Sequence, residues 1–258
     1  MPIAMTIAGS DPSGGAGLQA DLKTFHQHGV YGTSIVTLLT VQNTHAVSAV
    51  QTIDIDFVTA QLDAVVSDLP PTAAKTGALG SAAIIDAVAA RAADFVFPLV
   101  VDPVMISKHG ASLIDKKAIS SLRDQLIPKA FLLTPNRLEA ARLTDQNVVT
   151  IDQMMQAAST IFAMGARNVL VKGGGMNDQA VDVLYDGKRF SLFEAERIDT
   201  VHTHGTGCVL SAAITANLAN GLTLTKAIES AKRFISTAIQ SGSGVGNGIR
   251  PVDFHSPI

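Results

Sequence analysis

The sequence predicts an α/β protein whose central sheet is mostly parallel and is covered by helices on both faces. Short apolar, strand-like runs alternate with helical patterns almost from end to end of the 258 residues, as is typical of repeated strand–helix–strand units. The run Leu99–Val101 contains no polar residue, as expected for a strand that is buried on both faces. No linker, charge block or internal repeat divides the chain, so we expect a single domain over residues 1–258.

The first half of the chain begins with a short apolar run, which is followed by a glycine-rich segment and a helical pattern. A run rich in β-branched residues follows at 32–39, and Val58, Leu62 and Val65 then recur at helical spacing. In this half we expect strands at 4–8, 32–39, 47–53, 73–76 and 98–101, and helices at 16–28, 56–68, 81–91 and 116–125.

The second half continues the alternation and ends in two consecutive helical patterns. Asp186 and Gly187 stand between two strand-like runs and form a strong turn signal, so we expect an antiparallel hairpin there. In this half we expect strands at 131–134, 168–171, 181–185 and 188–193, and helices at 137–143, 151–164, 207–220 and 224–240.

Composition and charge exclude several classes of protein. Apolar residues make up 47% of the chain and charged residues 16%, which excludes a disordered chain. The formal net charge is −3 and Trp is absent, so we expect no nucleic-acid partner. No apolar run reaches the roughly 18 residues of a membrane span. Cys208 is the only cysteine, and residues 1–10 lack the basic region of an export signal, so we expect a cytoplasmic location.

Polar and glycine-rich segments follow several of the expected strands. Ligands of open α/β sheets bind beyond the carboxyl ends of strands, so these segments are candidates for one site. The glycines at 9–17 let a backbone approach a ligand closely, although an ordinary strand-to-helix turn explains them equally well. Their spacing matches neither a Walker A loop nor a dinucleotide fingerprint.

Three oxygen-bearing side chains form a candidate magnesium site. Asp102 directly follows a buried strand, and Asn136 and Glu139 are spaced so that they share one face of a helix start. Mg²⁺ prefers such oxygen ligands and keeps several waters while it bridges to phosphates. Asn136 and Glu139 also match a helix capping box, and the two interpretations are compatible.

Two further segments could bind the anionic part of a ligand. Lys172 ends a strand before a run of glycines, where it is either a phosphate contact or a surface lysine. Gly205 to Cys208 precede a helix, whose first N–H groups attract anions and are expected to lower the pKa of the thiol. The alternatives are a buried structural cysteine, or a metal site at His202 and His204, for which no clear third ligand exists.

Gln42 is a candidate for recognition of a ring with nitrogen donors and acceptors, and Asp21 is a further polar residue near the glycine-rich segment. Gln42 offers one acceptor and two donors, which suits a ring nitrogen beside an exocyclic amine, although it could also be an ordinary polar loop residue. Asp21 lies near the start of an expected helix. A solvated charge paired with a lysine is the simpler interpretation of Asp21 alone.

Motifs in these segments occur in a specific order over nearly the whole chain. They occupy residues 8–11, 14–24, 42–44, 75–80, 101–105, 134–140, 171–174 and 203–208. In that order they resemble the ribokinase-like kinases of vitamin precursors, and most closely the hydroxymethylpyrimidine/phosphomethylpyrimidine kinases of thiamin synthesis. Each motif is weak alone, but together they are specific.

The resemblance implies a fold, a reaction and a set of partners. The fold is the ribokinase-like three-layer α/β fold, with a small lid of edge strands to which residues 47–53 would contribute. The reaction is an ATP-dependent phosphorylation of a pyrimidine's primary alcohol and then of its monophosphate, with ATP and Mg²⁺ required. Relatives suggest a homodimer.

The resemblance also implies a role for each candidate residue. The pyrimidine would be held by Gly9, Asp21, Gln42 and Val104. The nucleotide would be held by Lys172, Asn136 and Thr206, and magnesium by Asp102 and Glu139. The catalytic anion hole would consist of Gly205, Thr206, Gly207 and Cys208, with Cys208 acting on the substrate hydroxyl.

Two features leave pyridoxal kinase, or a dual activity, open as the alternative. The triplet at 42–44 favours the pyrimidine, but the glycines at 173–175 followed by 180–187 resemble the pyridoxal branch. The segment 246–251 also departs from the Gly-His-Gly-Pro ending common in pyrimidine kinases. Alternatives from other classes are a catalytically inactive, ligand-binding relative and a nicotinamide oxidoreductase.

Overall fold

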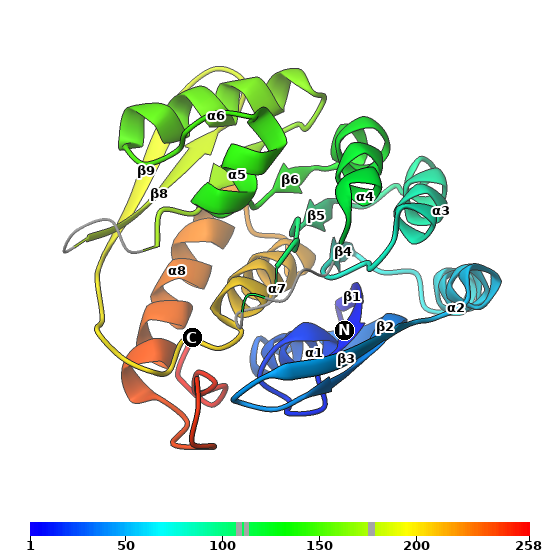
Figure 1. Cartoon of the computed structure of the whole chain (residues 1–258), viewed down its shortest axis with the longest axis horizontal. Helices are drawn as coiled ribbons and strands as arrows, with labels where there is room; N and C mark the ends of the chain where they lie inside the picture. Colours follow the sequence, from blue (N-terminus) through cyan, green and yellow to red (C-terminus); the bar gives the residue numbers. More distant parts are fainter. Residues whose placement is uncertain (107–109, 111–113, 175–178) are drawn as a thin grey trace.

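The structure, a computed structural model, describes residues 1–106, 110, 114–174 and 179–258. Within these residues the strands form one sheet in the order β3-β2-β1-β4-β5-β6-β7-β8-β9 (Figure 1). The strands are β1 (Ile3–Ser10), β2 (Tyr31–Gln42), β3 (Val47–Thr52), β4 (Ala73–Thr76), β5 (Leu99–Val101), β6 (Leu132–Leu133), β7 (Val169–Val171), β8 (Gln179–Tyr185) and β9 (Phe190–Glu196). The helices are α1 (Gly17–Gln27), α2 (Ile55–Asp68), α3 (Ala82–Ala92), α4 (Lys116–Ser121), α5 (Arg137–Thr144), α6 (Ile151–Ala163), α7 (Thr206–Ala219) and α8 (Leu224–Ser241), with the short turns η1 (Leu122–Leu126) and η2 (Ile127–Lys129).

Strand pairing confirms the predicted α/β fold with a mostly parallel sheet. Every neighbouring pair from β2 through β7 in the sheet is parallel, whereas β2/β3, β7/β8 and β8/β9 are antiparallel. A parallel connection needs a crossover, and helices supply it here, which explains the alternating sequence pattern. The hairpin β8–β9 turns at Asp186, whose carboxylate accepts the N–H groups of Lys188 and Arg189.

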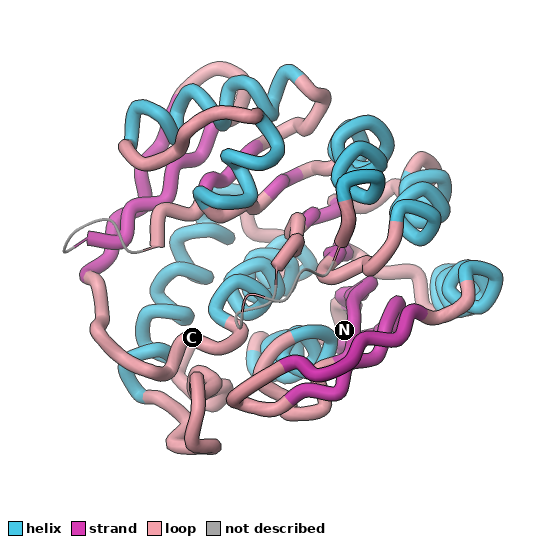
Figure 2. Tube along the Cα trace, viewed as in Figure 1, coloured by secondary structure: helices cyan, strands magenta, loops and turns pink. Residues whose placement is uncertain are grey.

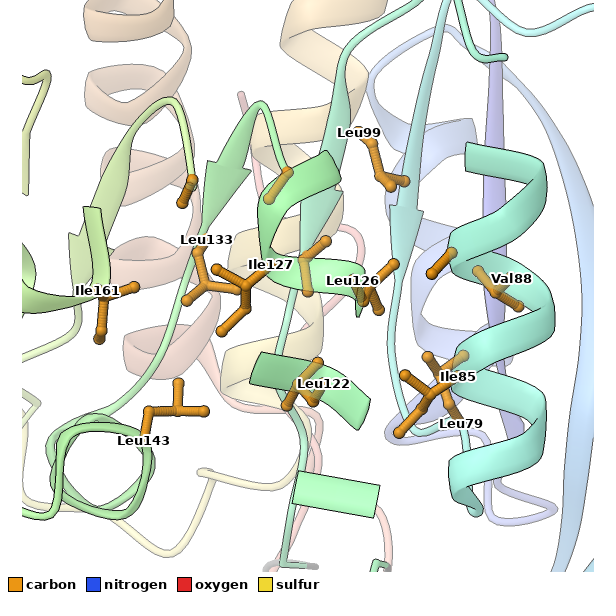
Figure 3. Close-up of a cluster of buried hydrophobic side chains, with 14 of the residues drawn as sticks. Leu79, Ile85, Val88, Leu99, Leu122, Leu126, Ile127, Leu133, Leu143 and Ile161 are labelled. Atoms are coloured by element: carbon orange, nitrogen blue, oxygen red, sulfur yellow. The ribbon is translucent and has the colours of Figure 1, made fainter. Parts of the chain in front are cut away.

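Helices cover both faces of the sheet (Figure 2). Apolar side chains of α2 to α6 pack on one face, and those of α1, α7 and α8 pack on the other. Successive strand residues point to opposite faces. Leu99 and Val101 therefore lie in the first layer, with the apolar side chains of α2 to α6, and Val100 lies in the second, with those of α7 and α8. Figure 3 shows Val88 and Leu126 among the side chains that fill the first layer. No described helix is both long enough and apolar enough to cross a bilayer.

Some boundaries differ from the sequence prediction. β1 continues to Ser10 and β2 to Gln42, so Gln42 is the last residue of a strand and not part of a loop. Polar residues weaken the strand signal there, while pairing with neighbouring strands keeps the backbone extended. The helix predicted at 116–125 ends as α4 at Ser121 and continues as η1 and η2, where Pro128 cannot donate a helical hydrogen bond.

The order of the strands determines where a ligand can bind. From β1 the chain passes to β2 on one side, whereas β4 and the later strands lie on the other side of β1. Such a switch opens a crevice at the carboxyl ends of the two central strands. The segments 11–17 and 77–80 follow those two ends, and both border the site described next.

Candidate active site

A cavity of about 930 Å³ opens at the carboxyl ends of the parallel strands. Every position to which the resemblance assigns a role lines this cavity. They are Gly9, Asp21, Gln42, Asp102, Val104, Asn136, Glu139, Lys172, Gly205, Thr206, Gly207 and Cys208. Segments that are far apart in the sequence thus form one surface, with Gln42 at the end of β2, beside the edge strand β3, and Lys172 after β7.

The N-terminus of α7 forms the floor of the predicted anion hole. Gly205 precedes the helix with φ 78°, and a Cβ there would overlap the carbonyl oxygen of Gly15, so only glycine fits. The first N–H groups of a helix have no partners within it. Gly207 lies beside Lys172, because a Cβ on it would be 3.3 Å from the Lys172 Nζ. Backbone donors and an ammonium group therefore converge on one point, which suits a phosphate.

Lys172 and Asp102 form an ion pair next to this anion hole. Lys172 Nζ lies 3.0 Å from Asp102 Oδ1, and the Ser211 hydroxyl donates to Asp102 Oδ2 at 3.2 Å. Burial alone would lower the pKa of Lys172, but the carboxylates of Asp102 and Glu139 raise it. Lys172 is therefore a fixed positive charge, and not the free surface lysine that the sequence left as an alternative.

Asn136 and Glu139 form the capping box that the sequence anticipated. The Glu139 N–H donates to Asn136 Oδ1 at 2.9 Å, and the Asn136 N–H donates to Glu139 Oε2 at 2.8 Å. Burial raises the pKa of Glu139 to about 7, against the opposing effect of Lys172. The cap and the predicted metal role use the same side chain, so the two interpretations remain compatible.

The donors in this corner fit a magnesium ion that is shared with a nucleotide. Asp102 and Glu139 provide carboxylates, and Mg²⁺ typically uses one or two of these together with substrate phosphates. Among the described residues, no cluster of three His, Cys, Asp or Glu side chains could hold a metal alone. The interpretation of His202 and His204 as metal ligands is wrong for the described chain.

Replacing Glu139 with Gln is expected to stabilise the metal-free protein at pH 8. The unfolded carboxyl ionises near 4.5 and the folded one near 7, so between these pH values only the unfolded chain loses the proton. The free energy of unfolding of the wild type therefore falls as the pH rises through this window, by roughly 3 kcal/mol at most. Glutamine keeps the capping box but has no proton to lose.

Urea unfolding of both proteins with a chelator checks this expectation at pH 5 and pH 8. The Glu139→Gln variant should exceed the wild type in unfolding free energy at pH 8, and the difference should shrink at pH 5. An equal difference at the two pH values would contradict the raised pKa of Glu139.

Asp21 is held by a residue to which the sequence analysis gave no role. Lys75 Nζ lies 2.8 Å from both carboxylate oxygens of Asp21, and the Thr6 hydroxyl donates to Asp21 Oδ2 at 2.6 Å. Both charged side chains are fully buried. The pairing with a lysine is as expected, but the charge is not solvated. A lysine inside the short apolar strand β4 was the signal that could have identified Lys75.

Cys208 differs from the sequence expectation in its ionisation. Burial raises the pKa of the thiol to about 12, although the charge of Lys75 and the Gly17 N–H oppose the rise. The expectation of a thiol pKa lowered by the helix is therefore wrong. Desolvation of the thiolate is the largest cause of the raised pKa, and the negative charges of Asp21 and Asp102 add to it. The thiol is protonated at neutral pH.

His204 and Asp11 join the glycine-rich segment to the anion hole. His204 Nε2 lies 2.8 Å from Asp11 Oδ2 and 3.3 Å from Gln42 Nε2. Burial alone would raise the pKa of Asp11, but hydrogen bonds from His204 and Ser13 lower it. Sequence reasoning gave Asp11 no role, although its place before a proline and a serine is typical of an Asx turn.

A family model described as phosphomethylpyrimidine kinase matches residues 11–253. The chain belongs to the phosphomethylpyrimidine kinase family. The hydroxymethylpyrimidine/phosphomethylpyrimidine kinase of Synechococcus elongatus is 46% identical to it, with 100% of this chain and 99% of the relative covered. The predicted membership of a kinase family is confirmed, and the nicotinamide oxidoreductase alternative is excluded.

Solved structures place this family beside the pyridoxal kinases. An ADP complex of Bacillus subtilis pyridoxal kinase has a TM-score of 0.91 and 40% identity, with 99% of this chain and 98% of that chain covered. A phosphomethylpyrimidine kinase from Clostridium difficile has a TM-score of 0.83 and 40% identity, with 93% of this chain and 100% of that chain covered. The ribokinase-like fold expected from the sequence is confirmed. These two solved structures do not separate the two substrates, because both are 40% identical to the chain.

Proposed function

We propose that this protein transfers the γ-phosphoryl group of ATP to the hydroxymethyl group of 4-amino-5-hydroxymethyl-2-methylpyrimidine, and then to the monophosphate, in thiamin biosynthesis. The observation that carries the proposal is the position of the anion hole. Residues 205–208 lie in one cavity with Gln42 at the edge-strand side and Lys172 at the other. A ring on the first side and a triphosphate on the second would meet at the N-terminus of α7.

Each side of the cavity has the chemistry of its proposed occupant. On the ring side Gln42 offers an amide to the ring nitrogen and exocyclic amine, and Gly9, Asp21 and Val104 complete the pocket. On the phosphate side the proposed ATP contacts are Lys172, Asn136 and Thr206. The ADP complex of the related pyridoxal kinase supports a nucleotide substrate.

The proposed step needs positioning more than covalent chemistry. The substrate oxygen forms a bond to the γ-phosphorus, the bond to the β,γ-bridging oxygen breaks, and ADP leaves with that electron pair. The hydroxyl proton is released late, to a phosphate oxygen or to solvent. Cys208 Sγ accepts a hydrogen bond from the hydroxyl and directs its lone pair at phosphorus. The N–H groups of Gly205, Thr206 and Gly207 and the Lys172 ammonium stabilise charge on the phosphoryl oxygens.

Magnesium would be held by Asp102 and Glu139. When bound, it would neutralise charge on the β- and γ-phosphates. Asn136 would orient Glu139 through the capping box, and the ion pair with Lys172 would hold the Asp102 carboxylate in place.

Product analysis tests the proposed function directly. ATP is supplied with hydroxymethylpyrimidine, with its monophosphate or with pyridoxal, and products are identified by mass. We expect the pyrimidine diphosphate to form. Phosphorylation of pyridoxal alone would support the second candidate, pyridoxal kinase, whose branch the sequence resembles at 173–175 and 180–187; both products would show a dual enzyme. Ligand binding without turnover would indicate a catalytically inactive relative.

We also propose that the protein acts as a homodimer of single-domain protomers in the cytoplasm. Leu39, Val41 and Val50 expose apolar side chains on the antiparallel β2–β3 edge, the predicted lid, where a second copy would cover them. The one free cysteine suits a reducing compartment. Light scattering should give twice the chain mass, and Val41→Lys should give the monomer mass; a monomeric wild type would contradict the dimer.

A further inference from the structure

A segment that follows α8 lies against the edge strands at the ring side of the cavity. Residues 243–251, which we call the strap, run beside the end of the β2–β3 hairpin (Figure 1). Val245 in the strap is 61% exposed, whereas Pro251 at its end is buried. The backbone hydrogen bonds of the strap show which segments it holds in place.

The strap is hydrogen-bonded to the turn that follows Gln42. The Ile249 N–H donates to the Thr44 carbonyl at 2.8 Å, and the Gly248 N–H donates to Thr44 Oγ1 at 3.2 Å. Gly246, at φ 83°, packs so closely on Thr44 that a Cβ would overlap the Thr44 Cγ2. The strap is therefore fixed directly to the turn by two hydrogen bonds and a close contact.

The same strap is bonded to the loop that carries His204. The Arg250 carbonyl accepts the His204 N–H at 2.9 Å, and the Arg250 N–H donates to the Val201 carbonyl at 2.9 Å. His204 in turn lies 3.3 Å from the Gln42 amide nitrogen. One segment therefore joins the two backbones whose side chains meet at the ring side of the cavity.

Local geometry makes Gln42 sensitive to that connection. The β2–β3 register shifts between Val41 and Gln42, and such irregularities re-aim the side chain of the strand that carries them. Gln42 Oε1 accepts a hydrogen bond from the Thr40 hydroxyl at 3.3 Å, and Gln42 Nε2 lies 3.3 Å from His204 Nε2, so the amide lies between its own strand and His204.

We infer that the strap is a specificity-determining segment, in which Thr44 and Gly246 are positioning residues that set the amide of Gln42 against His204 and so select the substrate ring. This inference rests on the proposed function. A pyrimidine presents a ring nitrogen beside an exocyclic amine, whereas pyridoxal presents a phenolic hydroxyl beside an aldehyde. A displaced amide loses its match to the first pattern, because recognition through buried hydrogen bonds depends strongly on position. The conflicting substrate signals at 42–44 and 246–251 thus belong to one structural unit.

A matched pair of glycine substitutions tests the inference. Gly246→Ala and Gly244→Ala both place alanine at a positive φ, of 83° and 67°, but nothing lies within 4 Å of a Cβ at Gly244. We expect Gly246→Ala to lower the ratio of kcat/KM for the pyrimidine to kcat/KM for pyridoxal by about tenfold. The main cause should be a higher KM for the pyrimidine. KM for ATP should stay the same. Gly244→Ala should leave the ratio unchanged.

Two further variants separate specificity from folding. Adding Thr44→Ser to Gly246→Ala removes the overlapping methyl group and should restore part of the ratio. Thr44→Val removes the acceptor for the Gly248 N–H without a change in size. It should shift the ratio in the direction expected for Gly246→Ala, so the inference can be tested even where Gly246→Ala does not fold. A ratio that is the same in wild type, Gly246→Ala and Thr44→Val overturns the inference, whatever the melting temperatures.

Calorimetric titration of the pyrimidine and of pyridoxal distinguishes failure of the inference from failure of the proposed function. If the wild type binds both compounds but phosphorylates neither, the proposed function fails, and the ratio of the two Kd values in the same variants still supports or overturns the inference. A wild type that binds neither compound overturns both.

Discussion

Replacing Lys75 with Met is expected to lower the free energy of unfolding by about 3–5 kcal/mol, because it leaves the Asp21 carboxylate without its buried partner. Both side chains of the pair have no exposed surface. Burial raises the pKa of Asp21, and Lys75 is the main group that opposes this rise. Urea unfolding of the ligand-free protein measures the loss.

The dependence of that loss on pH identifies its origin. Without Lys75 the folded Asp21 takes up a proton, whereas the unfolded carboxyl ionises near its ordinary pKa of 3.8. The variant should therefore lose stability as the pH rises from 4 to 8. The double variant Lys75→Met with Asp21→Asn removes the charge but keeps an acceptor for Thr6, so it should recover most of the stability. A single variant as stable as the wild type at pH 8 would show that the pair contributes nothing.

The Lys75–Asp21 ion pair is a contact that the sequence alone did not predict. The alternation of strands and helices was predictable because the apolar residues of each element recur with the period of a strand or of a helix. The location of the site was predicted from the rule that ligands bind at the carboxyl ends of strands. The partner of Asp21 was not readable, because Lys75 is 54 positions away. His204 and Asp11 are separated by 193 positions, and only the fold brings them together.

Ionisation was the least predictable property of the site. A cysteine at a helix N-terminus indicated a lowered thiol pKa, but that rule assumes access to solvent and a positive surrounding. Here burial dominates, and Asp21 and Asp102 lie close enough to raise the pKa of Cys208 further. Burial and neighbouring charge are properties of the packed chain, so a single sequence shows neither.

Replacing Cys208 with Ala is expected to lower kcat for pyrimidine phosphorylation by about 100-fold, while KM for ATP changes less than about twofold. Cys208 lies in the first turn of α7, where a substrate hydroxyl would meet the anion hole, whereas the proposed nucleotide contacts at Lys172 and Asn136 are on other segments. Steady-state kinetics of both substrates measure the two effects separately. A variant with normal kcat would remove Cys208 from the mechanism.

Cys208→Ser distinguishes the two ways in which Cys208 could act. A thiol with a pKa of about 12 is protonated at pH 7 and accepts a hydrogen bond without taking a proton. Serine can make the same hydrogen bond, so an orienting role leaves Cys208→Ser within about tenfold of the wild type and well above Cys208→Ala. A thiolate base instead requires that serine be as inactive as alanine and that wild-type kcat rise steadily with pH above 8. We expect the first outcome, because deprotonation would put a third negative charge beside Asp21 and Asp102 in a cavity where Lys75 already pairs with one of them.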